Sequence, residues 1–87
     1  MNIIIEPHTL ERAETRGATI EEIIEVIKNG DDFPAKYGKL GKMKIFDFKK
    51  ERNSKYYQQK RIEVIYLKKE ENIITVTVYV YYGKWEP

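Results

Sequence analysis

Apolar residues follow a helical spacing in the N-terminal part of the chain and an alternating spacing afterwards. The clearest helical stripe consists of four isoleucines: Ile20, Ile23, Ile24 and Ile27. Thr19 followed by Glu22 matches a capping box, in which two residues satisfy each other's backbone N–H groups at a helix start. Asn29 and Gly30 favour the end of this helix. The pattern therefore predicts a helix beginning after Thr19, with the isoleucines facing the core.

A second helix is expected before this one. Proline suits the first turn of a helix and glycine suits its end, so we expect a helix over Pro7–Arg16 that ends at Gly17. Leu10 and Ala13 fall on one side of it and are expected to face the core. The preceding Ile3–Ile5 forms either a short strand or an apolar lead-in.

After the second helix the chain shows loop and strand patterns. Asp31–Lys42 contains a proline and glycines and is typical of a loop. Alternation of apolar and polar residues then predicts three strands: Met43–Lys50, Lys55–Lys68 and Ile73–Tyr82. In the last strand, alternation places Ile74, Val76, Val78 and Val80 on one face and Thr75, Thr77, Tyr79 and Tyr81 on the other.

The order of these elements limits the fold. Connections between the strands are too short for the crossovers of a doubly wound parallel sheet. We therefore expect a single α+β domain over residues 1–87, with both helices packed on one face of a three- to four-stranded antiparallel meander. The other face is expected to be partly open and lined by tyrosine and basic side chains.

The absence of cysteine and the single histidine limit the catalytic and metal sites that the chain can form. The chain contains no cysteine and one histidine, which excludes disulfides, a thiolate nucleophile and a zinc-like cluster, so we expect no metal and no cofactor. Its N-terminus lacks the basic start and apolar run of a signal peptide. No apolar stretch approaches the ~20 residues that span a bilayer. We expect a soluble, cytoplasmic protein with no membrane association.

Basic residues are concentrated in the centre of the chain. The net charge is +2, but the segment Lys36–Arg61 carries ten basic residues against Asp47 and Glu51. Such a concentration favours an anionic partner, either nucleic acid or an acidic protein. The alternative is a lysine-rich face that meets only solvent.

Three side chains on the first helix form one candidate site. His8, Arg12 and Arg16 follow one another at intervals of four residues and so lie along one narrow stripe. Imidazole can transfer protons near neutral pH, and guanidinium can hold a phosphate with two hydrogen bonds. The alternative is a solvated face on which Glu11 and Glu14 pair with the arginines.

The strand that begins at Lys55 and the C-terminal strand supply the other candidates. Alternation places Lys55, Tyr57, Gln59 and Arg61 on one face and Tyr56, Gln58 and Lys60 on the other. Such a strand can stack on bases and neutralise phosphates, or its lysines can simply discourage aggregation at an exposed strand. Tyr81 and Tyr82, with Lys84 beside them, can stack on a base or transfer a proton, and packing is the alternative. Trp85 is expected to seal the end of the domain.

Several segments together resemble a prokaryotic domain family of unknown function: Pro7-His8 with Arg12 and Arg16-Gly17, the helix capped by Thr19, the strand Lys60-Arg61-Ile62-Glu63-Val64-Ile65-Tyr66, and the closing Thr-Val-Tyr-Val-Tyr-Tyr-Gly-Lys-Trp. This resemblance covers nearly the whole chain. The order helix, helix, meander also resembles the RelE-type toxins of the barnase, colicin and RelE group of ribonucleases.

The second resemblance implies a metal-independent endoribonuclease toxin, in which the ribose 2′-hydroxyl attacks the adjacent phosphate, and an antitoxin that covers the basic face. This chemistry needs an acid, a base and positive charge around the phosphorane. The residues implied are His8, Arg12, Arg61 and Tyr82 for catalysis, and Arg16, Lys55, Tyr57, Lys60, Tyr81 and Lys84 for RNA binding. Two alternatives stay open: a non-catalytic module that binds nucleic acid or protein on a basic, tyrosine-rich face, and a structural accessory subunit.

Overall fold

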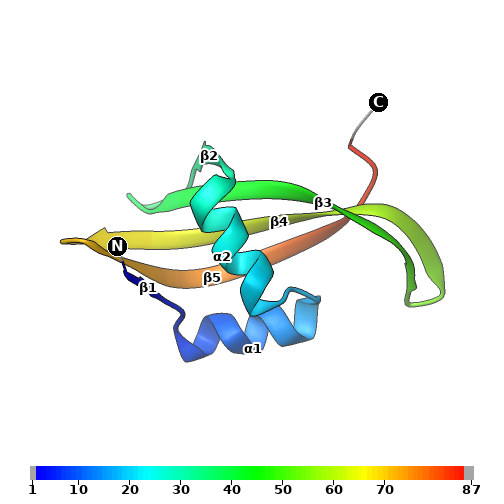
Figure 1. Cartoon of the computed structure of the whole chain (residues 1–87), viewed down its shortest axis with the longest axis horizontal. Helices are drawn as coiled ribbons and strands as arrows, with labels where there is room; N and C mark the ends of the chain where they lie inside the picture. The colour runs from blue at the N-terminus through cyan, green and yellow to red at the C-terminus, as the bar shows by residue number, and fades with distance from the viewer. Residues whose placement is uncertain (1, 86–87) are drawn as a thin grey trace.

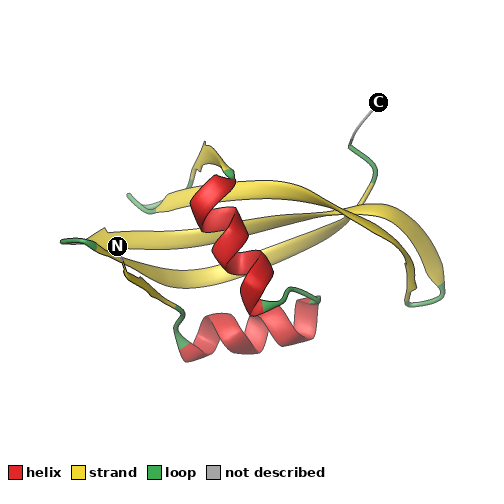
Figure 2. Ribbon diagram, in the orientation of Figure 1, coloured by secondary structure: helices red, strands yellow, loops and turns green. Residues whose placement is uncertain are grey.

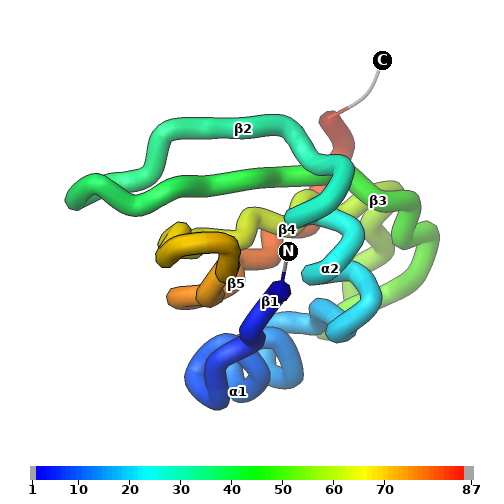
Figure 3. The backbone as a smooth tube through the Cα atoms, turned by 60° about the vertical axis from the view of Figure 1, so that its left-hand side comes forward, coloured from blue at the N-terminus to red at the C-terminus, as the bar shows by residue number. Residues whose placement is uncertain are grey.

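Within residues 2–85, which the computed structural model describes, the chain folds into a five-stranded sheet with two helices on one face (Figures 1 and 2). The elements are β1 (Asn2–Ile4), α1 (Pro7–Arg16), α2 (Ile20–Asn29), β2 (Asp31–Pro34), β3 (Leu40–Arg52), β4 (Lys55–Lys69) and β5 (Asn72–Gly83). The strands lie in the order β1-β5-β4-β3-β2. The tube view of Figure 3 shows α1 and α2 on the same side of the sheet. The predicted α+β class is confirmed.

The sheet contains the predicted meander and two further strands. β3, β4 and β5 pair antiparallel, β2 adds antiparallel to the start of β3, and β1 pairs in parallel with β5, with Ile3 opposite Ile73. The predicted three- to four-stranded antiparallel sheet is therefore corrected to a mixed sheet of five strands within residues 2–85. β1 overlaps Ile3–Ile5, for which a short strand is one of the two expectations, whereas β2 lies in the predicted loop. Both strands are only three or four residues long, too short to display alternation. Pro34 is tolerated in β2 because that strand lies at the sheet edge, so the predicted loop Asp31–Lys42 shrinks to the segment between Pro34 and Leu40.

Both helices begin and end close to where the sequence predicts. The Thr19 hydroxyl accepts a hydrogen bond from the Glu22 backbone N–H, and a Glu22 carboxylate oxygen accepts one from the Thr19 N–H, both at 3.0 Å. The capping box is thus confirmed. α1 ends at Gly17, whose φ of 94° is the left-handed conformation that glycine adopts without strain. Neither helix between residues 2 and 85 is long and apolar enough to cross a membrane.

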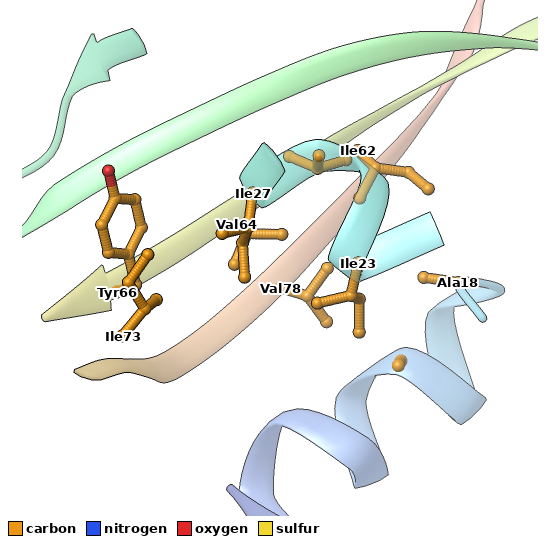
Figure 4. Packing of buried hydrophobic residues seen from close by; sticks show 10 residues of the cluster. Ala18, Ile23, Ile27, Ile62, Val64, Tyr66, Ile73 and Val78 are labelled. Carbon is orange, nitrogen blue, oxygen red and sulfur yellow. The ribbon is translucent and has the colours of Figure 1, made fainter. Parts of the chain in front are cut away.

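The hydrophobic core lies between α2 and the middle of the sheet (Figure 4). Ile23 of α2 lies beside Val78 of β5, while Ile27 shares the same cluster with Val64 of β4. The exposed fraction of these four residues is 3 % or less. Burying a side chain of this size contributes roughly 1.5–3 kcal/mol. Ile23 and Ile27 of the predicted stripe are thus in the core, together with Val26, which the stripe did not include. Ile20 is 49 % exposed at the start of the helix, so its predicted core position is wrong.

α1 packs along β5 largely through a polar contact. Ala13 is buried as predicted, but Leu10 is 39 % exposed, so its predicted core position is wrong. Thr9 faces the sheet instead. Its hydroxyl accepts a hydrogen bond at 2.8 Å from Thr75, which itself accepts one at 3.1 Å from the backbone N–H of Glu6. Both threonines are at most 1 % exposed, so this contact fixes the start of α1 on β5.

β5 contains one irregular position that changes its faces. Its pairing with β4 shifts between Thr75 and Thr77, which makes Val76 an extra residue in a β-bulge. Ile73 and Thr75 are buried under the helices before the bulge, and Val78 is buried there after it. The predicted regular alternation is therefore wrong for the first half of β5, because one extra residue reverses the faces.

The buried threonine contact leads to a stability prediction. Thr75→Val deprives the Thr9 hydroxyl and the Glu6 N–H of their shared partner, so we expect the free energy of unfolding to fall by about 1–3 kcal/mol. Thr77→Val, on the other side of the bulge, is the matched control and is expected to change it by less than about 0.5 kcal/mol. Urea denaturation followed by circular dichroism measures both values. Equal stability of Thr75→Val and the wild type would contradict this role for the contact.

Candidate functional site

Three side chains of the sheet hold the last carbonyl groups of α1. They are Arg52, which donates to Thr15 at 3.0 Å, Tyr82, which donates to Arg16 at 2.7 Å, and Lys60, which donates to Gly17 at 2.9 Å. The last carbonyls of a helix lack partners within it and carry the negative end of its dipole, so such donors stabilise them. A side chain at Gly17 would collide with the Tyr82 hydroxyl, so glycine is needed there for space as well. We call Arg52, Lys60 and Tyr82 the carbonyl cage.

Lys60 also joins α2 to the carbonyl cage. Its ammonium group lies 2.9 Å from a carboxylate oxygen of Glu22, and only 7 % of the residue is exposed. The same Glu22 closes the capping box of α2. One lysine therefore ties the end of α1 to the start of α2, and it is buried under the helices rather than presented on an open surface.

Tyr82 belongs to an aromatic cluster beside the cage. Its ring meets Phe48 edge-on at 5.0 Å between centroids and Tyr57 at 5.5 Å, and the Arg52 guanidinium lies 4.8 Å from its centroid. Burial raises the pKa of the Tyr82 hydroxyl, although the charge of Arg52 acts in the opposite direction. Alternation placed Tyr57 beside Arg61, but Tyr57 packs against Tyr82, because the β3–β4 hairpin bends beyond a register shift in β3 (Figure 1).

His8 is exposed near the start of α1, about one helical turn before Arg12. Its neighbour Thr9 touches Thr75 of β5. From there β5 extends about 20 Å further, at roughly 3.3 Å per residue, before it reaches Tyr81. Tyr81 is the cross-strand partner of Arg61. The start of α1, with His8, is therefore about 20 Å along β5 from the strand position opposite Arg61.

The four residues implied as catalytic occupy three separate places. His8 and Arg12 are exposed on α1. Tyr82 lies opposite Lys60 in the sheet, on the face that the helices cover, whereas the adjacent strand position Arg61 points to the other face. The structure thus does not bring these four side chains together within one chain, and their catalytic roles stay predictions.

The face of the sheet opposite the helices, which we call the open face, carries an ion pair on its central strand. Arg61 Nη2 lies 2.9 Å from Glu63 Oε2. Their cross-strand neighbours on β5 are Tyr81 and Tyr79, respectively. The Nε atom of Arg61 is buried and has no hydrogen-bond acceptor among residues 2–85, a condition that is uncommon in folded proteins. The middle of the open face is therefore charged and bordered by aromatic rings.

Tyr79 and Tyr81 form a stacked pair beside this ion pair. Their ring centroids lie 6.5 Å apart with 22° between the planes, and the residues are 38 % and 48 % exposed. Arg16, at the end of α1, donates to the Val78 carbonyl at 2.7 Å, and its guanidinium lies 5.0 Å from the centroid of Tyr79. Two exposed aromatic rings are thus flanked by a cation from a helix.

A groove of about 620 Å³ runs over β4 next to these rings. Its lining includes Glu63 and Ile65 of β4, Tyr79 and Tyr81 of β5, and residues 34–37 and 39 at the β2–β3 loop. We call it the tyrosine groove. In the loop, Tyr37 is 89 % exposed and the Lys39 ammonium lies 5.7 Å from its ring centroid. The groove therefore offers aromatic surface and positive charge on the loop side as well.

Only some of the residues implied in RNA binding meet at this groove. Arg16 and Tyr81 lie beside it, as does Arg61, whereas Lys60 and Tyr57 belong to the carbonyl cage and its aromatic cluster. The remaining two, Lys55 and Lys84, are exposed at the start of β4 and after β5. No group of three or more metal-ligating side chains lies together in the part of the chain that the structure describes.

Sequence reasoning did not single out Glu63 and Tyr79. The signal was available, because alternation puts Glu63 on the face of Arg61, and Tyr79 on the face of Tyr81. The register that sets Glu63 opposite Tyr79 could not be predicted from the sequence. It depends on the bulge in β5, and no local sequence pattern indicates that bulge.

The carbonyl cage predicts that Lys60 acts in stability. Lys60→Met leaves the Gly17 carbonyl and the Glu22 carboxylate without their partner, so we expect the free energy of unfolding to fall by roughly 1–3 kcal/mol. Lys55→Met, on the exposed start of the same strand, should leave it within about 0.5 kcal/mol. Chemical denaturation of both variants measures this. A loss confined to Lys55→Met would reverse the assignment.

The raised pKa of Tyr82 predicts a pH dependence. Because the folded-state pKa lies above the unfolded value of about 10, the contribution of Tyr82 to stability is fully present below pH ~10 and is lost as the pH rises through the folded value. The difference in unfolding free energy between the wild type and Tyr82→Phe should therefore shrink above pH ~10. Absorbance titration should show that Tyr82→Phe lacks a phenol that ionises above the usual pH range of tyrosine. A titration curve with that phenol retained would contradict the assignment.

The family described as "Domain of unknown function (DUF4258)" matches residues 5–80. That range includes both helices, the β2–β3 loop, and the positions of Arg61, Glu63 and Tyr79, while Tyr81 and Tyr82 follow it directly. No curated protein and no solved structure matches the chain. The protein belongs to the DUF4258 family of domains of unknown function.

Proposed function

We propose that the protein binds single-stranded RNA on the open face of its sheet, with the bases in the tyrosine groove. The observation that carries this proposal is the exposed, stacked pair Tyr79 and Tyr81 with Arg16 at one side and Arg61 at the other. Aromatic rings offer a stacking surface to any base, and arginine offers charge-assisted hydrogen bonds to phosphate.

The dimensions and charge of the site support a nucleic-acid ligand. A volume of about 620 Å³ lies within the range of roughly 300–1,000 Å³ that holds small ligands, and so accommodates a base. Unpaired bases can be splayed onto a sheet surface, whereas the bases of a duplex are stacked on one another. Further cations stand on the β3–β4 hairpin, where the exposed Lys49, Lys50 and Lys55 are suited to contact phosphates outside the groove.

Resemblance to RelE-type toxins supports RNA over other anions, since the helix, helix and meander order is shared with that group. It also leads us to propose that an acidic antitoxin protein covers the same face. Such a partner and RNA would then compete for Arg61 and the two tyrosines. A cytoplasmic location follows from this proposal, because the RNA of a prokaryotic cell is found there.

Binding can be tested with a fluorescent single-stranded RNA. Removing one stacking ring costs about 1–3 kcal/mol per base, so Tyr81→Ala should weaken binding by about 5- to 150-fold. Tyr56→Ala, which removes a tyrosine that is 55 % exposed on the hairpin, is the matched control and should bind like the wild type. Fluorescence anisotropy at several salt concentrations measures the affinity, which should fall as salt rises. Equal losses in both variants would count against the groove, and no binding by the wild type would refute the proposal.

Cleavage of the bound RNA stays a separate prediction from the resemblance. If the protein cleaves RNA in this way, cleavage should continue in the presence of EDTA and should be lost in His8→Ala while the fold stays intact. Because the start of α1, which carries His8, meets β5 about 20 Å along the strand from Tyr81, the partner of Arg61, the groove by itself favours binding without a reaction at His8. Retained cleavage in His8→Ala would remove the imidazole from the mechanism, and uncut RNA with measurable affinity would favour the binding module.

A further inference from the structure

We infer that the tyrosine groove selects guanine, whose hydrogen-bonding edge donates to the carboxylate of Glu63. This inference rests on the proposed function, because it concerns which base enters the same groove. It starts from a feature that RNA binding alone does not explain: a carboxylate stands in the middle of a face that should attract phosphates.

Glu63 is held at a central place on the open face. Its strand is the middle one of the sheet, and its cross-strand neighbours are Met43 on β3 and Tyr79 on β5. The Glu63 side chain is 15 % exposed and lines the groove. The ion pair with Arg61 uses the Oε2 atom, and a carboxylate has about four lone-pair sites, so the pair leaves capacity to accept further hydrogen bonds.

A carboxylate distinguishes the bases by the donors that each presents. Guanine carries an N1–H and an N2 amino group side by side, so it can donate to both oxygens of one carboxylate. Adenine and cytosine each place a single amino group beside a ring nitrogen acceptor, which repels a carboxylate. Uracil places one N–H between two carbonyl oxygens. Among the four bases, only guanine presents two adjacent donors to Glu63.

The walls of the groove suit the faces of the same base. The groove is lined by Tyr79 and Tyr81 of β5 and by the β2–β3 loop with the exposed Tyr37. A base stacked on the two tyrosines would have β4 beside it, where Glu63 lies opposite Tyr79. Aromatic stacking accepts every base, so the choice between bases falls to the groups on β4.

The simpler explanation is that Glu63 only neutralises Arg61. In that case Glu63 would discourage all RNA equally, and its replacement would raise the affinity for every base by a similar factor. Recognition of guanine predicts instead a change in the ratio of affinities. The two explanations therefore differ in a measurable quantity.

The experiment uses the full chain and single-stranded uridine oligonucleotides of one length, in which the central base is uracil, guanine, adenine, cytosine or hypoxanthine. Hypoxanthine is guanine without the N2 amino group. A good bidentate contact discriminates by about 1–3 kcal/mol, so the guanine oligonucleotide should bind roughly 5- to 150-fold more tightly than the adenine and cytosine ones. The hypoxanthine oligonucleotide should lie between them.

Glu63→Gln should abolish this preference, so that the guanine oligonucleotide binds no more tightly than the adenine and cytosine ones. The amide keeps the shape of the side chain but replaces one acceptor oxygen by a donor. Glu71→Gln, at the exposed β4–β5 turn, is the control and should retain the full preference. Circular dichroism checks that each variant is folded.

The outcomes separate the two proposals. Equal affinity of the wild type for all five oligonucleotides would overturn the guanine inference and leave RNA binding intact. A guanine preference that survives in Glu63→Gln would overturn the role of Glu63. Absence of binding to any oligonucleotide would overturn the proposed function and this inference with it.

Discussion

The end of α1 is the point on which the arrangement of both helices depends. A short helix that buries little apolar surface cannot be held by packing alone, and its last carbonyl groups need donors. The sheet supplies these donors from β3, β4 and β5 at once, through Arg52, Lys60 and Tyr82. Lys60 passes the contact on to Glu22 and so orients α2, whose isoleucines then cover the sheet. The carbonyl cage therefore sets the position of the helix whose apolar side chains complete the hydrophobic core.

The contacts of the carbonyl cage separate the basic residues of the protein into two groups by the face of the sheet on which they lie. Lys60 and Arg52 compensate the negative end of a helix dipole and are committed to the fold. Arg16 and Arg61 instead lie beside the tyrosine pair, where Arg16 also donates to the Val78 carbonyl and Arg61 pairs with Glu63. A count of positive charges along the sequence cannot make this division. Proximity in sequence even misleads, because Lys60 and Arg61 are neighbours that serve opposite faces of the sheet.

The sequence predicts those parts of the fold whose signals are local. The capping box of Thr19 and Glu22, the helix end at Gly17 and the three long strands are all visible as short-range patterns, and the structure contains them. β1 and β2 are too short to show a period, and their pairing depends on distant partners. The open face could be expected from the meander, but the register that places Glu63 beside Tyr79 could not. The separation of His8 from Arg61 likewise follows from how α1 docks, which no spacing along the chain reveals.

The bulge at Val76 has a consequence for how this domain can vary. On one side of it β5 supports β1 and the start of α1, and on the other side it displays the rings of the open face. An irregular residue between two paired segments absorbs small changes in length locally. The outer segment stays tied to the fold, because Val78 is buried in the core and Tyr82 holds the end of α1. Its outward-facing positions, such as Tyr79 and Tyr81, are exposed and can exchange while the inner packing is preserved. Related chains are free to keep the same scaffold and present different chemistry at this edge of the sheet.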